Sequence, residues 1–85
     1  MRSFELAGRE IVLCRTRAGV FALDNLCTHA SARMSEGYLR GTRLVCPLHG
    51  GSFDVESGCA LVSPAMQRLA TYPTRVVEGM IEVAL

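Results

Sequence analysis

Apolar residues in this sequence occur in short runs that are separated by glycine and polar turn residues, and no stretch keeps the spacing of an amphipathic helix. This pattern is typical of short β-strands. Residues 10–15 and 20–23 flank a turn that ends at Gly19, so they predict one hairpin. Residues 38–39 and 43–46 flank Gly41 and predict a second hairpin.

The C-terminal half of the chain continues the same pattern. The remaining predicted strands comprise residues 52–55, 69–72, 74–77 and 80–84. Pro73 predicts a break or a sheet edge, because proline cannot donate a backbone hydrogen bond. The sequence therefore predicts an all-β fold, with about seven short strands in a small antiparallel barrel or sandwich.

Length and charge restrict the class of protein. Residues 1–85 suffice for one small domain, and a net charge of +1 excludes a strongly basic nucleic-acid-binding module. The longest stretch without Asp, Glu, Lys or Arg is residues 57–67, whereas a membrane-spanning helix needs about 20 apolar residues. No apolar segment of a secretory signal follows Met1, so we expect a cytoplasmic protein with no membrane partner.

The chain's two histidines each lie close to a cysteine. One pair is Cys27 and His29, and the other is Cys46 and His49. Both pairs follow predicted strands, and the hairpin between them would return the chain so that the two loops lie side by side. Each loop would then offer one thiolate and one imidazole, which are ligands for zinc or iron.

This spacing resembles the Rieske iron–sulfur signature, C-x-H followed by C-x-x-H. Residues 24–61 are similar to the Rieske ferredoxins of bacterial aromatic-ring-hydroxylating dioxygenases, most closely those of the naphthalene type. The resemblance implies one [2Fe–2S] cluster per chain, in which Cys27 and Cys46 bind one iron and His29 and His49 bind the other. It also implies a cluster-binding subdomain of two loops at about residues 24–64.

The same resemblance implies a function as a one-electron carrier and not as an enzyme. The electron donor would be a flavin-containing, NAD(P)H-dependent reductase, and the acceptor would be a separate terminal oxygenase. A third loop around Pro64 would cover the cluster, and Leu48, Ala30, Pro64 and Met66 would surround the histidines as a docking patch. The oxygenase itself is excluded, because its 2-His-1-carboxylate iron site needs two further histidines.

Sequence differences within the family predict the reduction potential. Respiratory Rieske proteins have a disulfide and two hydroxyl groups that donate hydrogen bonds to sulfur. The corresponding positions here hold Ala32 and Leu48 in place of the disulfide, and Gly51 and Phe53 in place of the hydroxyls. Because such hydrogen bonds stabilise the reduced state, their loss predicts a potential at the low end of the Rieske range.

Two alternatives use the same residues. A structural zinc site of two cysteines and two histidines is chemically adequate, although zinc fingers usually keep their cysteines together and their histidines together. A Rieske-like subunit of a nitrite reductase would have the fold, but many such subunits lack the ligands.

The remaining features are given structural interpretations. Cys14 is predicted to be a core thiol and Cys59 an incidental one, and a disulfide between them has no support in the sequence. Arg33, Glu36 and Arg40 predict a solvated face. Rieske ferredoxins usually begin with a further strand before the segment that matches residues 4–13, so we expect an edge of the sheet to lack a partner.

Overall fold

A computed structural model of the chain describes residues 1–27, 32–48, 50–62 and 67–85. Within this part of the chain all regular structure is β-strand, apart from one short 3-10 helix. The strands are β1 (Arg2–Leu6), β2 (Arg9–Thr16), β3 (Gly19–Asp24), β4 (Tyr38–Arg40), β5 (Arg43–Val45), β6 (Ser52–Asp54), β7 (Ala60–Val62), β8 (Thr71–Tyr72), β9 (Thr74–Val77) and β10 (Met80–Val83). The 3-10 helix η1 spans Met34–Glu36.

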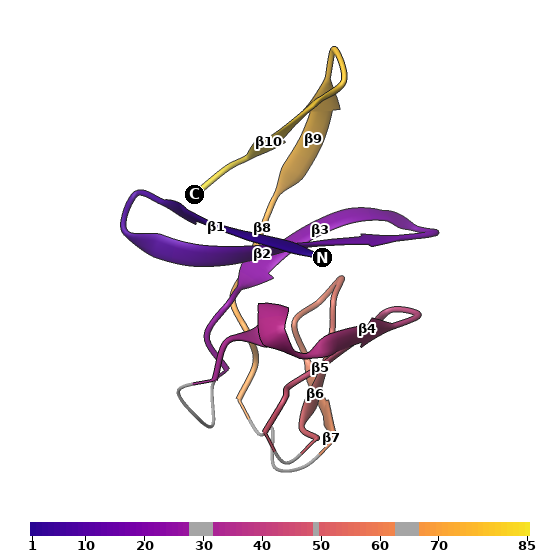
Figure 1. Cartoon of the computed structure of the whole chain (residues 1–85). Helices are drawn as coiled ribbons and strands as arrows, with labels where there is room; N and C mark the ends of the chain where they lie inside the picture. Colours follow the sequence, from indigo (N-terminus) through magenta and orange to yellow (C-terminus); the bar gives the residue numbers. More distant parts are fainter. Residues whose placement is uncertain (28–31, 49, 63–66) are drawn as a thin grey trace.

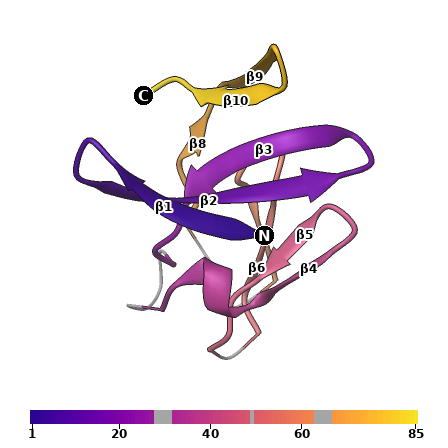
Figure 2. The ribbon, with the colours of Figure 1, turned by 45° about the horizontal axis from the view of Figure 1, so that its top comes forward.

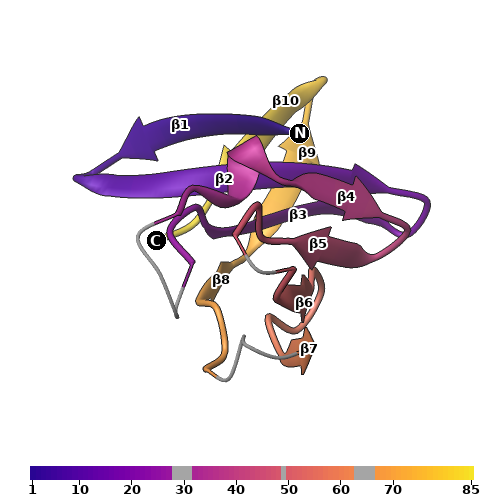
Figure 3. The same ribbon diagram turned by 60° about the horizontal axis from the view of Figure 1, so that its bottom comes forward.

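The strands form three antiparallel sheets. The first sheet has the order β1-β2-β3-β8, the second has the order β4-β5-β6-β7, and β9 pairs with β10 alone. In Figures 1 and 2 the sheet that contains β2 and β3 lies between the other two. Figure 3, a view from below, shows β4, β5, β6 and β7 in sequence order across the second sheet.

The hydrophobic core lies between the first two sheets. Val12 and Cys14 of β2 and Leu23 of β3 face Leu44 and Phe53 of the second sheet, and all five side chains are fully buried. Because side chains of a strand alternate between its faces, Leu13 and Val20 point to the other side of the first sheet. There they line a cavity of about 470 Å³ together with Ile81 of β10.

The predicted all-β fold is confirmed. Both hairpins form: Leu13 pairs with Ala22 in the first, and Leu39 pairs with Leu44 in the second. The predicted strands 74–77 and 80–84 also pair, and the turn between them has Gly79 at a φ of 79°.

The sequence prediction missed three elements: β1, β7 and η1. The β1–β2 turn lacks the usual Asn-Gly or Asp-Gly pair, and Ala7 itself adopts a positive φ of 52°. β7 is short and its pairing with β6 shifts in register beside Ser52. η1 is the only helical element among the described residues, and its formation depends on contacts that are distant in the sequence.

One glycine connects the second sheet to the segment that precedes β8. Gly58 has a φ of +78°, and its carbonyl accepts a hydrogen bond of 2.9 Å from the Leu69 backbone N–H. A Cβ atom at this position would lie 2.2 Å from the Leu69 carbonyl oxygen. The close approach of the two backbones therefore requires glycine.

Replacing Gly58 by alanine is expected to destabilise the fold more than the same change at Gly41. Gly41 also has a positive φ, +62°, but a Cβ there would meet no atom within 4 Å. Gly41→Ala should therefore lower the free energy of unfolding by roughly 1–2 kcal/mol through backbone strain alone. Gly58→Ala should add a further ~1–3 kcal/mol from overpacking. Thermal unfolding followed by circular dichroism checks this, and equal losses in the two variants would contradict it.

Candidate metal centre

Cys27 stands at the base of the first predicted ligand loop. It follows β3 by three residues, and its backbone N–H donates a hydrogen bond of 2.9 Å to the carbonyl of Ala32. One residue earlier, Leu26 forms a β-bridge with Arg33. The residues on either side of the segment 28–31 are therefore paired, and Cys27 occupies the last rung before that segment.

Cys46 stands in the same position in the second loop. It directly follows β5, and its backbone N–H donates a hydrogen bond of 2.7 Å to the carbonyl of Gly51. In both loops the cysteine therefore donates to the carbonyl five residues further along the chain. Gly50, just before the acceptor residue, has a φ of 73°, a backbone conformation that glycine adopts without strain.

The two thiols lie against each other in the core. Cys27 is 6% exposed and Cys46 is 2% exposed, and both belong to the same buried cluster. Burial raises the pKa of the Cys46 thiol, a hydrogen bond from the Leu48 backbone amide lowers it, and the hydrogen bond with the Cys27 thiol raises it again. A hydrogen bond from this amide favours the thiolate form of Cys46.

A glycine outside the predicted motif allows the Cys46 loop to pack. A Cβ atom at Gly37 would lie 1.9 Å from the carbonyl oxygen of Val45 and 3.2 Å from Cδ of Pro47. The backbone before β4 can therefore touch the residues on both sides of Cys46 only if residue 37 has no side chain. Gly37 was not singled out from the sequence.

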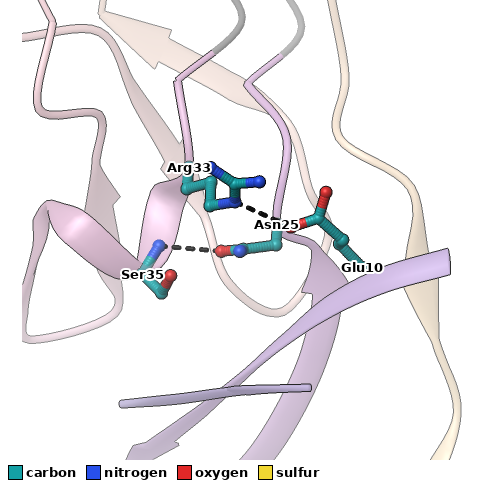
Figure 4. A network of polar contacts seen from close by, with 4 residues as sticks. All are labelled: Glu10, Asn25, Arg33 and Ser35. Carbon is teal, nitrogen blue, oxygen red and sulfur yellow. Dashed lines mark hydrogen bonds and ion pairs between the residues drawn. The ribbon is translucent and has the colours of Figure 1, made fainter. Parts of the chain in front are cut away.

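A polar network supports the Cys27 loop from the other side (Figure 4). The Asn25 side-chain oxygen accepts a hydrogen bond of 2.8 Å from the backbone N–H of Ser35, and the Arg33 guanidinium pairs with Glu10 at 2.8 Å. Arg33 was predicted to lie on a solvated face, and it is indeed largely exposed while making this ion pair. Asn25 was not singled out from the sequence.

Asp24, which precedes Asn25, is held by the first sheet. Its backbone N–H donates to the carbonyl of Ala70 at 2.9 Å, and the hydroxyl of Tyr72 donates to its carboxylate. The pKa of Tyr72 is raised, first by burial and then by its hydrogen bond to the Asp24 carboxylate. These two hydrogen bonds hold the end of β3 against the segment of Ala70 and Tyr72, three residues before Cys27.

Several predicted site residues lie outside the described residues. They are His29, His49, Ala30, Pro64 and Met66. Of the predicted docking patch, the structure describes Leu48, which is 45% exposed, and the neighbouring loop adds Leu26 at 46%. Within the described ranges no three His, Cys, Asp or Glu side chains gather into a metal-binding group.

The other two cysteines lie as predicted. Cys14 is fully buried in β2, Cys59 is exposed, and both are free thiols, so no disulfide joins them. Burial raises the pKa of the Cys14 thiol to about 11. Cys14 packs in the same core cluster as Cys27 and Cys46, yet its place within β2 keeps it out of both loops.

Comparison with known proteins decides the family. A family model described as the Rieske [2Fe-2S] domain matches residues 1–73. The chain belongs to the Rieske family. The naphthalene 1,2-dioxygenase system ferredoxin component of Pseudomonas putida is 51% identical over 69 residues, which are 81% of this chain and 66% of that protein. This Rieske chain thus spans about two thirds of the length of the first curated relatives it matches.

Solved structures agree with this Rieske assignment. The ferredoxin of carbazole 1,9a-dioxygenase from Nocardioides aromaticivorans superposes with a TM-score of 0.94 at 33% identity, over 98% of this chain and 82% of that one. A complex of reduced oxygenase and oxidized ferredoxin in carbazole 1,9a-dioxygenase contains a chain with a TM-score of 0.93 at 34% identity, over 98% of this chain and 78% of that one.

The described residues fit the [2Fe–2S] cluster of the family. Two buried thiols meet at the bases of two loops that close in the same way, and an amide is directed at one sulfur. Each cysteine is followed in the sequence by a histidine, at positions 29 and 49. The sequence therefore contains the two cysteines and two histidines that Rieske ligation requires.

The two non-loop cysteines are expected to differ strongly in reactivity toward iodoacetamide. Thiolate is the reactive form, so Cys59 should be alkylated within minutes at pH 8, while Cys14 should react at least about a hundredfold more slowly. The Cys14 rate should rise as the pH approaches 11, its pKa in the folded chain. Peptide mass spectrometry of the cluster-loaded protein measures both rates. Equal rates below pH 9 would show that Cys14 is not a core thiol.

Proposed function

We propose that this chain is a Rieske-type ferredoxin that carries single electrons to a terminal aromatic-ring-hydroxylating oxygenase. The observation that carries the proposal is the burial of Cys27 and Cys46 in one core cluster, at the bases of two similarly closed loops. The relatives support it, because their printed names describe ferredoxin components and subunits of dioxygenase systems. The chain itself would transform no substrate.

We propose Cys27, His29, Cys46 and His49 as the cluster ligands, with the thiolates on one iron and the imidazoles on the other. Residues 24–64 would form the cluster-binding subdomain of a single domain, residues 1–85. The second sheet and η1 support this division, because both lie within that range and flank the Cys46 loop.

When bound, a [2Fe–2S] cluster supplies one reversible one-electron step. The protein residues set the energy of that step. Two thiolates and two neutral imidazoles bring less negative charge than four thiolates, so adding an electron costs less in a buried site. The Leu48 amide offsets part of the thiolate charge on Cys46, since it donates a hydrogen bond to that sulfur.

The residues after the second loop favour a potential at the low end of the Rieske range. Gly51 has no side chain, and the side chain of Phe53 is a hydrocarbon ring that is fully buried in the core. Neither residue therefore offers a hydroxyl to a sulfur atom. Ser52 lies between them, but alternation along β6 puts its side chain on the sheet face opposite to Phe53.

Partners would dock at the loop end of the molecule. Leu48 lies within the Cys46 loop and Leu26 directly precedes Cys27, and both side chains are about half exposed. Small apolar surfaces suit the short-lived contacts of electron transfer. A flavin-containing, NAD(P)H-dependent reductase would be the electron donor and the oxygenase the acceptor.

The proposed electron donor indicates the cell compartment. No helix in the part of the chain that the structure describes is long and apolar enough to span a membrane. We propose a cytoplasmic location, where the NAD(P)H-dependent reductase would supply the electrons.

The experiment that tests the function is spectroscopy of anaerobically purified protein. We expect iron and inorganic sulfide in equal amounts and a red-brown colour. After reduction with dithionite, the protein should give a rhombic EPR signal with an average g below that of an all-thiolate cluster. Stoichiometric zinc with no sulfide, and therefore colourless protein, would favour the structural zinc site and contradict the proposal.

His49→Cys tests the ligand assignment and the charge argument together. The added thiolate should lower the midpoint potential by on the order of 100 mV, because all-thiolate ferredoxins lie near about −400 mV and Rieske centres between about −150 and +300 mV. Redox titration of the cluster-loaded variant measures the shift. Met80→Glu, which adds a negative charge in β10, is the control and should leave the midpoint unchanged. An unchanged midpoint in His49→Cys would reject the assignment.

Leu48→Glu tests the docking surface. The variant should keep its visible spectrum yet reduce the oxygenase about tenfold more slowly, because a buried charge replaces an apolar contact. Met80→Glu again serves as the matched control, since Met80 is exposed and lies in the hairpin on the far side of the first sheet (Figure 1). Stopped-flow mixing of reduced ferredoxin with oxidised oxygenase gives the rates. If both variants reduced the oxygenase equally slowly, the oxygenase would not dock at Leu48.

A further inference from the structure

The segment from Asn25 to Cys27 is paired, residue by residue, with the segment from Ala32 to Met34. The Asn25 carbonyl accepts a hydrogen bond of 2.6 Å from Met34, Leu26 bridges to Arg33, and Cys27 donates to Ala32. These pairs form a short ladder that ends at Cys27. Anything that fixes the start of this ladder also fixes the position of the Cys27 sulfur.

Asn25 provides a side-chain contact at the start of this ladder. It is 1% exposed, and a buried amide needs a hydrogen-bond partner. Its side-chain oxygen accepts the Ser35 backbone N–H at 2.8 Å, while its own backbone N–H donates to the Glu10 carbonyl at 2.9 Å. One residue thereby joins β2, the Cys27 segment and η1, as Figure 4 shows for its side chain.

The Asn25 side chain also supplies a cap that η1 lacks locally. The N-terminal N–H groups of a helix have no partner within it, and a polar side chain just before the helix usually accepts one of them. Arg33 occupies that position and makes no such hydrogen bond. The amide of Asn25, ten residues earlier in the sequence, accepts the Ser35 N–H instead.

The capped helix in turn contacts the second loop. Met34 of η1 is fully buried in the cluster of core residues that contains both Cys27 and Cys46. The contact between Arg33 and Glu10 joins the same segments, but the two side chains are 54% and 31% exposed, so the pair contributes little. The hydrogen bond from Ser35 to Asn25 is part-buried and its acceptor residue is 1% exposed, so it is the stronger restraint.

From these contacts we infer that Asn25 is a positioning residue for the metal centre, which holds the Cys27 sulfur in register with the Cys46 sulfur through its hydrogen bond to Ser35. The inference rests on the proposed cluster-binding function. Loss of the side-chain acceptor should speed the release of the cluster without unfolding the sheets, because the strand pairings of both sheets remain.

The test compares Asn25→Leu, which has similar size but no acceptor, with Asn25→Asp, which keeps one. Cluster loss from the intact, loaded protein is followed by the decay of visible absorbance in excess chelator, with far-UV circular dichroism recorded in parallel. Asn25→Leu should lose its cluster about tenfold faster than the wild type, because the part-buried Ser35 N–H is left without a protein partner. Its EPR signal should broaden while the dichroism stays unchanged. Asn25→Asp should remain within about threefold of the wild-type rate.

The matched control is the double variant Glu10→Gln, Arg33→Gln, which removes the exposed ion pair between the same segments and keeps the net charge. It should lose its cluster at the wild-type rate. Wild-type decay in Asn25→Leu, loss of dichroism in step with absorbance, or equal decay in the control would each overturn the inference. Should Asn25→Leu fail to fold, a tenfold faster decay in Asn25→Asp overturns it and a near-wild-type decay supports it. Wild-type protein that binds no cluster would instead reject the proposed function.

Discussion

The meeting of two buried cysteine thiols is the constraint on which the rest of this structure depends. Isolated thiolates are costly to bury, so two of them are placed together only where a cation compensates their charge. Three features position the two loops that carry these sulfurs. They are the second sheet, the hydrogen bond of Asn25, and the glycine at position 37, where a side chain would not fit. The first sheet supplies the opposite wall of the core, through Val12, Cys14 and Leu23.

The family assignment and the loop geometry together distinguish the competing functions. Zinc and iron–sulfur sites can use the same four side chains, but matching the Rieske domain over residues 1–73 favours the cluster. A nitrite reductase subunit without ligands would have no reason to pair two buried thiols. The dioxygenase ferredoxins resemble this chain over most of its length, and the proposed cluster site with the half-exposed Leu26 and Leu48 beside it would suit such a carrier.

Local signals made most of the fold predictable. Gly19, Gly41 and Gly79 mark turns whose conformation needs a glycine, and the strands on both sides were identified from them. β1 was missed because nearly all of its residues are exposed, so its sequence lacks the alternation that identifies a half-buried strand. η1 was missed because its cap, Asn25, lies on a different segment and becomes a neighbour only after folding. For the site, the spacing of Cys27 and Cys46 predicted their approach, whereas the need for glycine at position 37 follows from the path of the Val45 backbone.

The way in which the two loops close has a consequence for the maturation of the protein. Classical zinc fingers are unfolded until metal arrives, since the ion itself holds the ligands together. Here each loop is shut by a hydrogen bond between backbone groups, from Cys27 to Ala32 and from Cys46 to Gly51, and neither bond involves a ligand atom. The backbone therefore adds hydrogen bonds of its own to whatever the metal contributes to each loop. During maturation the closing of the two loops would not depend on the metal ligands alone.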